Sequence, residues 1–202
     1  MKYKCITGGP ISENCYLLID EKTNQAAVVD PGFLNDVLLN EIKKYTVQRI
    51  LLTHGHFDHI WEADRLHEML GVPVCAYETE AAFAADDKQN GSLLMMYESI
   101  TCKVHEAFKD GETFQIGEVP VTVLHTPGHT LGGVSYITSD AVFTGDTLMG
   151  YSVGRCDLPT GNSAELRESL KKLAALPGNP DICGGHGPVT TLEDEKRRNP
   201  YL

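Results

Sequence analysis

The chain has 202 residues, of which 42% are hydrophobic, and carries a formal net charge of -11 at pH 7. This length and composition can bury one substantial core, so we expect a single domain over residues 1–202. The acidic charge and the lack of a basic stripe exclude a nucleic-acid partner, and no apolar stretch approaches the ~20 residues that span a membrane.

The N-terminal residues predict no export signal, because Gly8 and Gly9 interrupt the chain before a signal-peptide apolar region develops. Six cysteines are scattered through apolar segments without a Cys-x-x-Cys pair. Reduced, buried thiols are the usual state of such residues in the cytoplasm. We therefore expect a cytoplasmic protein.

The first elements predicted along the chain are a β-hairpin and a helix. Residues 14–19 and 25–29 have strand-like composition and are joined by a polar turn. Apolar residues then recur at helical spacing through residues 35–44, which predicts a helix over one face of the sheet. Asp30, at the end of the second strand, is either an ordinary turn residue or a hydrogen-bond acceptor that supports a ligand histidine.

The most informative segment follows the apolar run at residues 49–52. Its spacing is His-x-His-x-Asp-His, formed by His54, His56, Asp58 and His59. Side chains two residues apart in an extended segment point the same way, so the first two histidines can converge on one cation. Asp58 and His59 then face a neighbouring point. A solvated polar loop is a poor alternative for four ligand-type residues at this spacing, and the segment predicts a site for two metals.

Three later segments repeat this arrangement, each with an apolar, strand-like run that leads into a glycine-containing loop with a metal-ligand residue. Residues 119–124 precede His129, residues 141–144 precede Asp146, and residues 181–183 precede His186. Sites commonly form outside the carboxyl ends of sheet strands. We therefore expect all these residues to meet.

Between these runs, residues 60–70 predict a helix, residues 72–76 a strand and residues 78–88 a short helix. Residues 93–97 are apolar but lack periodicity, which fits either a flap over the site or simple packing.

The later part of the chain adds a hairpin and a helix. Residues 113–117 form the first strand of the predicted hairpin. Residues 163–176 predict a helix, which Asn162 and Glu165 begin at capping-box spacing. A final short helix or turn is expected at residues 193–198.

Four further ligand-type residues are not assigned to the metal site. His67 lies on the packing face of its predicted helix, and His105 has only Glu106 as a ligand-type neighbour. His125 is either an ordinary residue at a strand end or a residue that supports a ligand. Cys156 lies either near substrate or, as is commoner for an unactivated cysteine, inertly in its loop.

The ordered motifs resemble those of the metallo-β-lactamase superfamily, and within it the small proteins similar to glyoxalase II (hydroxyacylglutathione hydrolase). Besides the His-x-His-x-Asp-His segment, the matching pieces are Val29-Asp30-Pro31-Gly32, Thr126-Pro127-Gly128-His129-Thr130, Gly145-Asp146-Thr147-Leu148, Gly154-Arg155-x-Asp157-Leu158-Pro159 and Gly185-His186-Gly187-Pro188. The resemblance implies an α/β fold, a four-layer αβ/βα sandwich of two mixed sheets packed face to face with helices outside. Its two halves would be roughly residues 1–110 and 111–202.

The resemblance also implies a set of metal ligands. The first metal would be held by His54, His56 and His129, the second by Asp58, His59 and His186, and Asp146 would bridge both. Two divalent cations are expected, with zinc first and iron or manganese as alternatives.

The resemblance implies hydrolysis of a small-molecule thioester, and by analogy a hydroxyacyl thioester. The nucleophile would be a hydroxide that bridges the two metals. Asp58 would bind metal and orient the nucleophile. Arg155 is the candidate for binding an anionic part of the substrate, unless it only pairs with Asp157. Larger glyoxalase II enzymes carry a C-terminal helical region that helps bind glutathione, whereas only a short tail follows His186 here. The thiol carrier is therefore open.

Several other functions remain to be weighed. Hydrolysis of another ester or a lactone fits the same site, as does a persulfide dioxygenase with one iron held by His54, His129 and Asp146. A di-iron redox protein usually has an acidic residue at the position of His56, so the histidine argues against that function. A purely structural metal is improbable, since structural zinc sites are four-coordinate and rich in cysteine.

Overall fold

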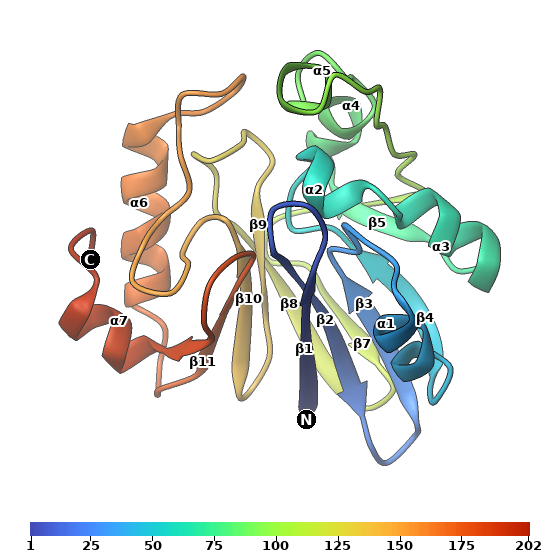
Figure 1. The fold of residues 1–202 in the computed structure, drawn as a ribbon. Helices are drawn as coiled ribbons and strands as arrows, with labels where there is room; N and C mark the ends of the chain where they lie inside the picture. The colour runs from blue at the N-terminus through green and yellow to red at the C-terminus, as the bar shows by residue number, and fades with distance from the viewer.

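Two six-stranded mixed sheets packed face to face form the centre of the computed structural model, which describes residues 1–202 (Figure 1). The first sheet has the strand order β1 (Lys2–Gly8), β2 (Glu13–Asp20), β3 (Gln25–Val29), β4 (Thr46–Leu51), β5 (Val74–Tyr77) and β6 (Glu106–Phe108). The second has the order β12 (Thr190–Thr191), β11 (Asp181–Gly184), β10 (Ala141–Gly145), β9 (Val134–Ile137), β8 (Val119–His125) and β7 (Thr113–Ile116). Strands β3 to β6 run parallel, as do β10 and β11.

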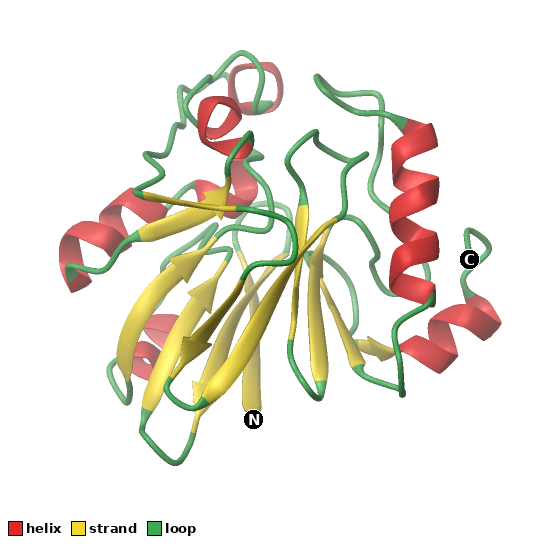
Figure 2. Ribbon diagram, turned by 180° about the vertical axis from the view of Figure 1, so that it is seen from behind, coloured by secondary structure: helices red, strands yellow, loops and turns green.

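Helices cover the outer sides of both sheets (Figure 2). The helices are α1 (Asp36–Ile42), α2 (Phe57–Ile60), α3 (Ala63–Leu70), α4 (Glu80–Ala84), α5 (Ser92–Met95), α6 (Ser163–Ala174) and α7 (Leu192–Arg198). The first five lie on the side of the first sheet, and α6 and α7 lie on the side of the second (Figure 1). The predicted four-layer sandwich is confirmed. None of these helices combines the length and apolar composition that crossing a membrane requires.

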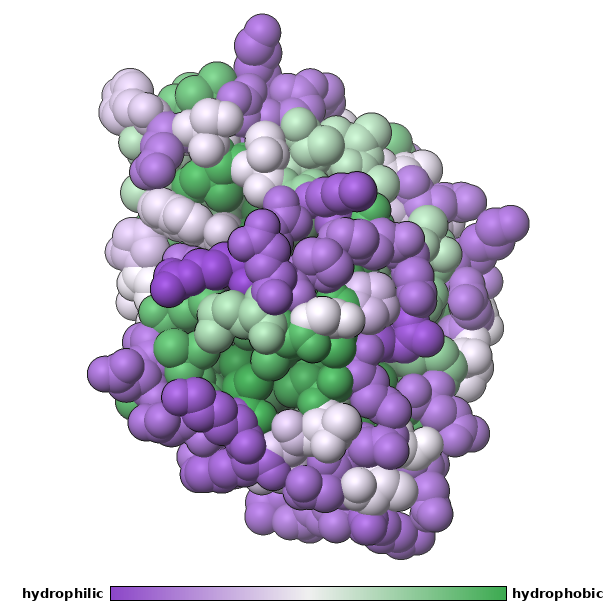
Figure 3. All heavy atoms as spheres, turned by 90° about the vertical axis from the view of Figure 1, so that its right-hand side faces the viewer, coloured by the Kyte–Doolittle hydropathy of each residue, from purple (hydrophilic) through white to green (hydrophobic).

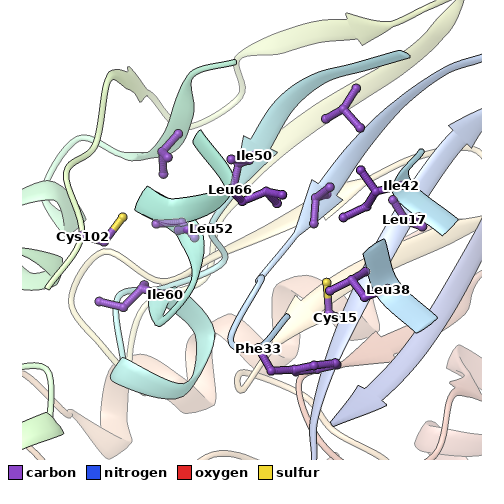
Figure 4. Packing of buried hydrophobic residues seen from close by; sticks show 14 of the residues in the cluster. Cys15, Leu17, Phe33, Leu38, Ile42, Ile50, Leu52, Ile60, Leu66 and Cys102 are labelled. Atoms are coloured by element: carbon purple, nitrogen blue, oxygen red, sulfur yellow. The ribbon is translucent and has the colours of Figure 1, made fainter. Parts of the chain in front are cut away.

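The sequence of β2 explains how the layers are joined. Cys15 and Leu17 pack in the core under the helices of the first sheet (Figure 4), and Ile19 belongs to the same core. Tyr16 and Leu18 instead face the core between the sheets. Successive side chains of a strand point to opposite faces, so one fully buried strand contributes to two cores. A third core lies between the second sheet and α6.

Helix α6 has the expected apolar stripe and N-cap, but its capping box is incomplete. The Asn162 side chain accepts hydrogen bonds from the backbone N–H groups of Ala164 and Glu165. The backbone N–H of Asn162 donates to Gly128 O instead of to the Glu165 side chain. The helix start is therefore also joined to the loop before His129.

The structure corrects several predicted elements. The chain opens with β1, an edge strand that has mixed polar and apolar residues, and short strands β6, β9 and β12 were not predicted. The helix predicted at residues 60–70 is wrong at its start, because α2 ends at Ile60 and α3 begins at Ala63. Of the helix predicted at residues 78–88 only α4 forms, and a short helix, α5, contains the first three residues of the apolar stretch 93–97 that lacks periodicity. Strands β6, β9 and β12 were missed because two to four residues are too few to show a period.

Candidate metal centre

The seven side chains predicted as metal ligands meet where four strands end. His54 and His56 follow β4, Asp58 and His59 lie in α2, His129 follows β8, Asp146 follows β10 and His186 follows β11. Six of these residues are buried or nearly so, and the His186 side chain is 25% exposed. Both sheets therefore contribute to one centre, as the repeated strand-and-loop pattern predicts.

The motif after β4 changes from extended chain to helix within three residues. His56 has an extended backbone and is the N-cap of α2. The single turn of α2 then presents Asp58 and His59, which a straight continuation of the strand would separate onto opposite faces. This local change lets four neighbouring residues serve two separate positions.

The first group consists of His54, His56 and His129, each of which offers a ligand atom within 4.8 Å of the others. His56 Nδ1 lies 2.8 Å from His129 Nε2. The second group consists of Asp58, His59 and His186, with His186 Nε2 3.1 Å and His59 Nε2 3.4 Å from Asp58 Oδ2. Each group has the size and donor types of a metal site.

Asp146 lies between the two groups. Its Oδ1 is 3.5 Å from His59 Nε2, and its Oδ2 is 3.5 Å from His129 Nε2 and 3.8 Å from His186 Nε2. One carboxylate thus lies near both groups, with Oδ1 beside the second group and Oδ2 beside both. This is the placement expected of a bridging ligand.

Hydrogen bonds at Nδ1 orient three of the rings. The acceptors are Asp30 Oδ2 at 3.0 Å from His59, Arg155 O at 2.7 Å from His129 and Ser12 O at 3.3 Å from His186. Because a carbonyl or carboxylate can only accept, each imidazole donates from Nδ1, and in its neutral form its lone pair is then on Nε2. Metal-binding histidines are commonly oriented in this way.

Asp30 is a supporting acceptor, the second of the two roles the sequence allows for it. Its carboxylate accepts from Thr53 N at 2.7 Å and Thr53 Oγ1 at 2.6 Å as well as from His59. Since the Thr53 hydroxyl donates to Asp30, its oxygen is free to accept from His54 Nδ1, 3.1 Å away. Asp30 therefore orients one ring directly and a second through Thr53, and its own oxygens are already engaged.

Several buried atoms in the centre lack a hydrogen-bond partner in the protein, and they test whether metal ions fit. His54 Nε2, His56 Nε2, His59 Nε2 and Asp146 Oδ1 are buried without a hydrogen bond. Leaving such atoms unsatisfied is costly. Imidazole and carboxylate groups suit zinc, iron and manganese, so the donors present fit divalent cations.

Gly185 allows the two groups to approach each other. A Cβ at this position would overlap Asp146 Oδ1 and lie 2.6 Å from His59 Cε1. Only glycine leaves this space to the ligand side chains.

Burial and mutual charge give the ligands opposite pKa shifts. Burial lowers the pKa of His56 to about 3, with a further contribution from His129. Burial also opposes charge on His59, but Asp58, Asp146 and Asp30 outweigh it and raise the pKa of His59 well above its usual value. Burial would raise the pKa of Asp146, but His59 and the neighbouring histidines hold it well below its usual value. The Asp146 carboxylate is thus ionised and ready to bind cations.

Three residues next to the centre were not singled out from the sequence. Thr53 connects Asp30 to His54, and Glu80 Oε1 accepts from Gly55 N at 2.8 Å within the motif. Glu13 is 1% exposed, its carboxylate has no partner, and burial raises its pKa well above the usual value. The one sequence signal for Glu80 is that an acidic residue precedes the apolar residues 81–83, in a helix of which Glu80, Phe83 and Ala84 are buried. The positions of Thr53 and Glu13 depend on segments that are distant in the sequence, and they leave no local pattern.

The remaining candidate histidines lie outside both groups. His67 stacks on His105 with ring centroids 3.9 Å apart, and His125 stacks on Tyr77 at 4.2 Å. Cys156 lines a neighbouring cavity and is absent from the wall of the cavity over the metal centre.

A cavity of about 190 Å³ opens over the candidate ligands. Its remaining wall consists of Ile11, Phe57, Met95, Met149, Gly154, Arg155 and Leu158. Arg155 forms two hydrogen bonds with Asp157, at 2.6 and 2.7 Å. The guanidinium therefore both borders the cavity and fixes its own loop.

Residues 8–186 match the family model of the metallo-beta-lactamase superfamily. Over 208 residues the chain is 37% identical to a Bacillus subtilis protein named "Probable metallo-hydrolase YqgX", covering 100% of this chain and 98% of that one. It is 31% identical over 209 residues to hydroxyacylglutathione hydrolase GloC of Haemophilus influenzae, with coverage of 100% and 98%.

Three solved structures are similar to this chain along nearly its whole length. The BLEG-1 B3 metallo-beta-lactamase superposes with a TM-score of 0.93 at 34% identity and covers 100% of this chain and 99% of that one. TTHA1623 in a di-iron-bound form gives 0.84 at 34% identity, with coverage of 98% and 100%. ETHE1 from Myxococcus xanthus gives 0.81 at 30% identity, with coverage of 99% and 84%.

Proposed function

Because this chain belongs to the metallo-β-lactamase superfamily, we propose that it is a metal-dependent hydrolase that cleaves small-molecule thioesters with two divalent cations. His54, His56 and His129 would hold one cation, and Asp58, His59 and His186 the other, with Asp146 between them. Two cations so held would polarise the substrate carbonyl and lower the pKa of water. Zinc is the first candidate, and the di-iron form of TTHA1623 makes iron the main alternative.

The observation that carries the choice of a thioester is the lack of a proton donor in the cavity wall. Apart from five of the candidate ligands (His56, Asp58, His129, Asp146 and His186), the wall offers apolar side chains, Gly154 and Arg155. The pKa of Arg155 is raised by its hydrogen bonds with Asp157, so it cannot donate a proton to a leaving group near neutral pH. A substrate whose leaving group departs without protonation fits this wall.

Thioesters meet that requirement. The oxygen of water bonds to the carbonyl carbon, the carbon–sulfur bond breaks with its electron pair going to sulfur, and a carboxylic acid and a thiol result. A thiol pKa near 8.5 lets the thiolate leave unprotonated, whereas an alkoxide needs a proton. Esters and lactones are therefore expected to be poorer substrates than thioesters with the same acyl group.

Asp58 is the residue proposed to orient the attacking water. Burial would raise its pKa, but His59 and the hydrogen bond from His186 hold the pKa below its usual value. The ionised carboxylate lines the cavity and can accept a hydrogen bond from water there. The likeness to a relative named hydroxyacylglutathione hydrolase along the whole chain supports the same reaction class.

The test is release of free thiol from a panel of thioesters by zinc-loaded protein, with matched oxygen esters beside them. Replacing Asp58 or His54 by alanine should lower kcat/KM at least about a hundredfold, because each contributes to one of the two groups. His67→Ala is the matched control, since this histidine stacks on His105 outside the centre. It should retain wild-type activity.

Metal content distinguishes thioester hydrolysis from the alternative function, a persulfide dioxygenase with one iron. Protein purified without added metal should contain about two zinc, iron or manganese ions per chain. A single iron per chain, together with oxygen uptake in the presence of a persulfide, would replace thioester hydrolysis with the dioxygenase function. Loaded protein that releases no thiol from any thioester would also contradict the proposal.

A further inference from the structure

The wall of the cavity over the metal centre is apolar on several sides. Ile11 lies in the turn between β1 and β2, Met95 lies in α5, and Met149 and Leu158 belong to the long loop after β10. These segments are far apart in the sequence, yet each directs an apolar side chain to the same cavity. The apolar wall is therefore a property of the fold and cannot be read from any one segment.

Exposure of these side chains is not in itself unusual. Figure 3 shows the side of the molecule that carries α1 and α3, where hydrophobic residues also reach the surface. Met69 of α3 is 51% exposed, compared with 42% for Met95 and 42% for Ile11. Single exposed apolar residues are common. Met95 and Ile11 differ from Met69 because they line a cavity beside candidate metal ligands.

The base of α5 is fixed to the metal motif, which gives Met95 a defined position. Asn90 is fully buried, and its backbone carbonyl accepts a hydrogen bond from Phe57 N at 3.1 Å. The Asn90 side chain accepts from Ser92 N at 3.0 Å and donates to Ile100 O at 2.7 Å. The turn of helix that carries Met95 is thereby attached to residues next to His56 and Asp58.

The charge of the wall residues and the volume of the cavity further limit which part of a substrate can enter. Apart from the candidate ligand histidines, Arg155 is the one cationic residue in the wall, and it is already paired with Asp157. Glutathione has two carboxylates, which would find no free cation among these residues. At about 190 Å³ the cavity is smaller than pockets that enclose whole drug-sized ligands. It can enclose an acyl group but not a large thiol carrier.

We infer that the site selects thioesters with an uncharged, apolar acyl group, which packs against Ile11, Met95, Met149 and Leu158 while the thiol carrier remains outside. This inference rests on the proposed thioester hydrolysis. Each methylene that enters the cavity removes apolar surface from water and should favour the bound state up to about fourfold.

The experiment uses zinc-loaded protein and thioesters of one small uncharged thiol, N-acetylcysteamine, that carry acetyl, butanoyl or hexanoyl groups. The value of kcat/KM should rise with acyl chain length until the cavity is full. The hexanoyl thioester should also have a higher kcat/KM than lactoyl glutathione. Affinities of the corresponding ethyl, butyl and hexyl thioethers, measured by calorimetry, should rise in parallel, because these analogues bind without being cleaved.

Met95→Glu should remove most of the chain-length preference and lower kcat/KM for hexanoyl about tenfold, because a carboxylate resists the apolar environment. Ile11→Glu should act in the same direction from a different segment. Met69→Glu is the matched control, with the same substitution at a similarly exposed methionine, and should leave the preference unchanged. Thermal unfolding of each variant checks that the fold is retained.

The outcomes separate this inference from the proposed function. Thioesterase activity with no chain-length preference, or equal effects of Met95→Glu and Met69→Glu, would overturn only the apolar selectivity. A preference for lactoyl glutathione over hexanoyl would do the same. Failure to cleave any thioester would overturn both.

Discussion

Asp30 and Thr53 show how a few buried groups orient a metal centre. The Asp30 carboxylate accepts from His59 and from both the backbone and the hydroxyl of Thr53, and that hydroxyl can then accept from His54. His59 would serve the second cation and His54 the first. The two proposed sites are therefore joined by hydrogen bonds behind the ligands as well as by Asp146 between them.

Metal binding should release protons, because two proposed ligands hold them in the metal-free protein. The pKa of His59 is raised by Asp58, Asp146 and Asp30 against the effect of burial, and the pKa of His186 is raised by its hydrogen bond to Asp58, also against burial. A cation needs the neutral imidazole, so bound protons must leave. Zinc affinity should consequently fall as the pH is lowered below the folded pKa values of these histidines.

The measurement is calorimetric titration of metal-free protein with zinc in two buffers that differ in ionisation enthalpy. About one to two protons should be released per chain at pH 7. His186→Asn should reduce that number, whereas His67→Asn should not change it. Equal heats in both buffers would show that the histidines are already neutral.

At the scale of elements, α4 packs against the metal motif and supports it. Glu80 of α4 accepts a hydrogen bond from Gly55 N, between the first two histidines. A Cβ at Gly55 would lie 2.9 Å from a ring carbon of Phe83 and 3.1 Å from Ala84, so the helix packs directly against the motif backbone. The segment between β5 and β6 thus fixes the course of the ligand-bearing chain.

Replacing Glu80 by alanine should destabilise the protein and disturb the motif. The change leaves the buried N–H of Gly55 without its partner, which costs about 1–3 kcal/mol of unfolding free energy. Urea unfolding of metal-loaded protein measures this loss, and elemental analysis should show reduced metal content. Glu78→Ala is the control, since that side chain is exposed two residues earlier. Equal stabilities of the two variants would mean that the Gly55 contact contributes nothing.

The elements also show what sequence patterns can reveal. The four strands that lead to the ligands were predictable because each is an apolar run that ends in a glycine-containing loop, as β10 does before Asp146. The break between α2 and α3 was not predictable, because apolar residues continue at helical spacing through Ile60 and Ala63. It follows from a long-range contact, the hydrogen bond from Glu62 N to Pro31 O. The roles of Glu80 and Met95 likewise depend on contacts that join distant segments.

In the whole molecule, side chains of β2 connect the two sheets beside the candidate metal centre. The Asn14 side chain of β2 donates to Gly184 O at 3.1 Å and Gly187 O at 2.9 Å, and the Tyr16 hydroxyl donates to Gly184 O at 2.7 Å. These bonds hold the loop that carries His186 against the first sheet. The second proposed cation would then take Asp58 and His59 from the first half of the chain and His186 from the second.

Cations shared between the halves should stabilise the fold as a whole. A ligand that binds only the folded state at about a thousand times its dissociation constant adds about 4 kcal/mol. For a protein of this size, that corresponds to a rise in Tm of about 8–16 °C. Differential scanning calorimetry of loaded and chelator-treated protein should show this difference, and His129→Ala should reduce it because one group then has two of its three residues. If chelation removed the metal, as judged by elemental analysis, without lowering Tm, the contacts of β2 with the His186 loop and the core between the sheets would suffice to hold the halves together.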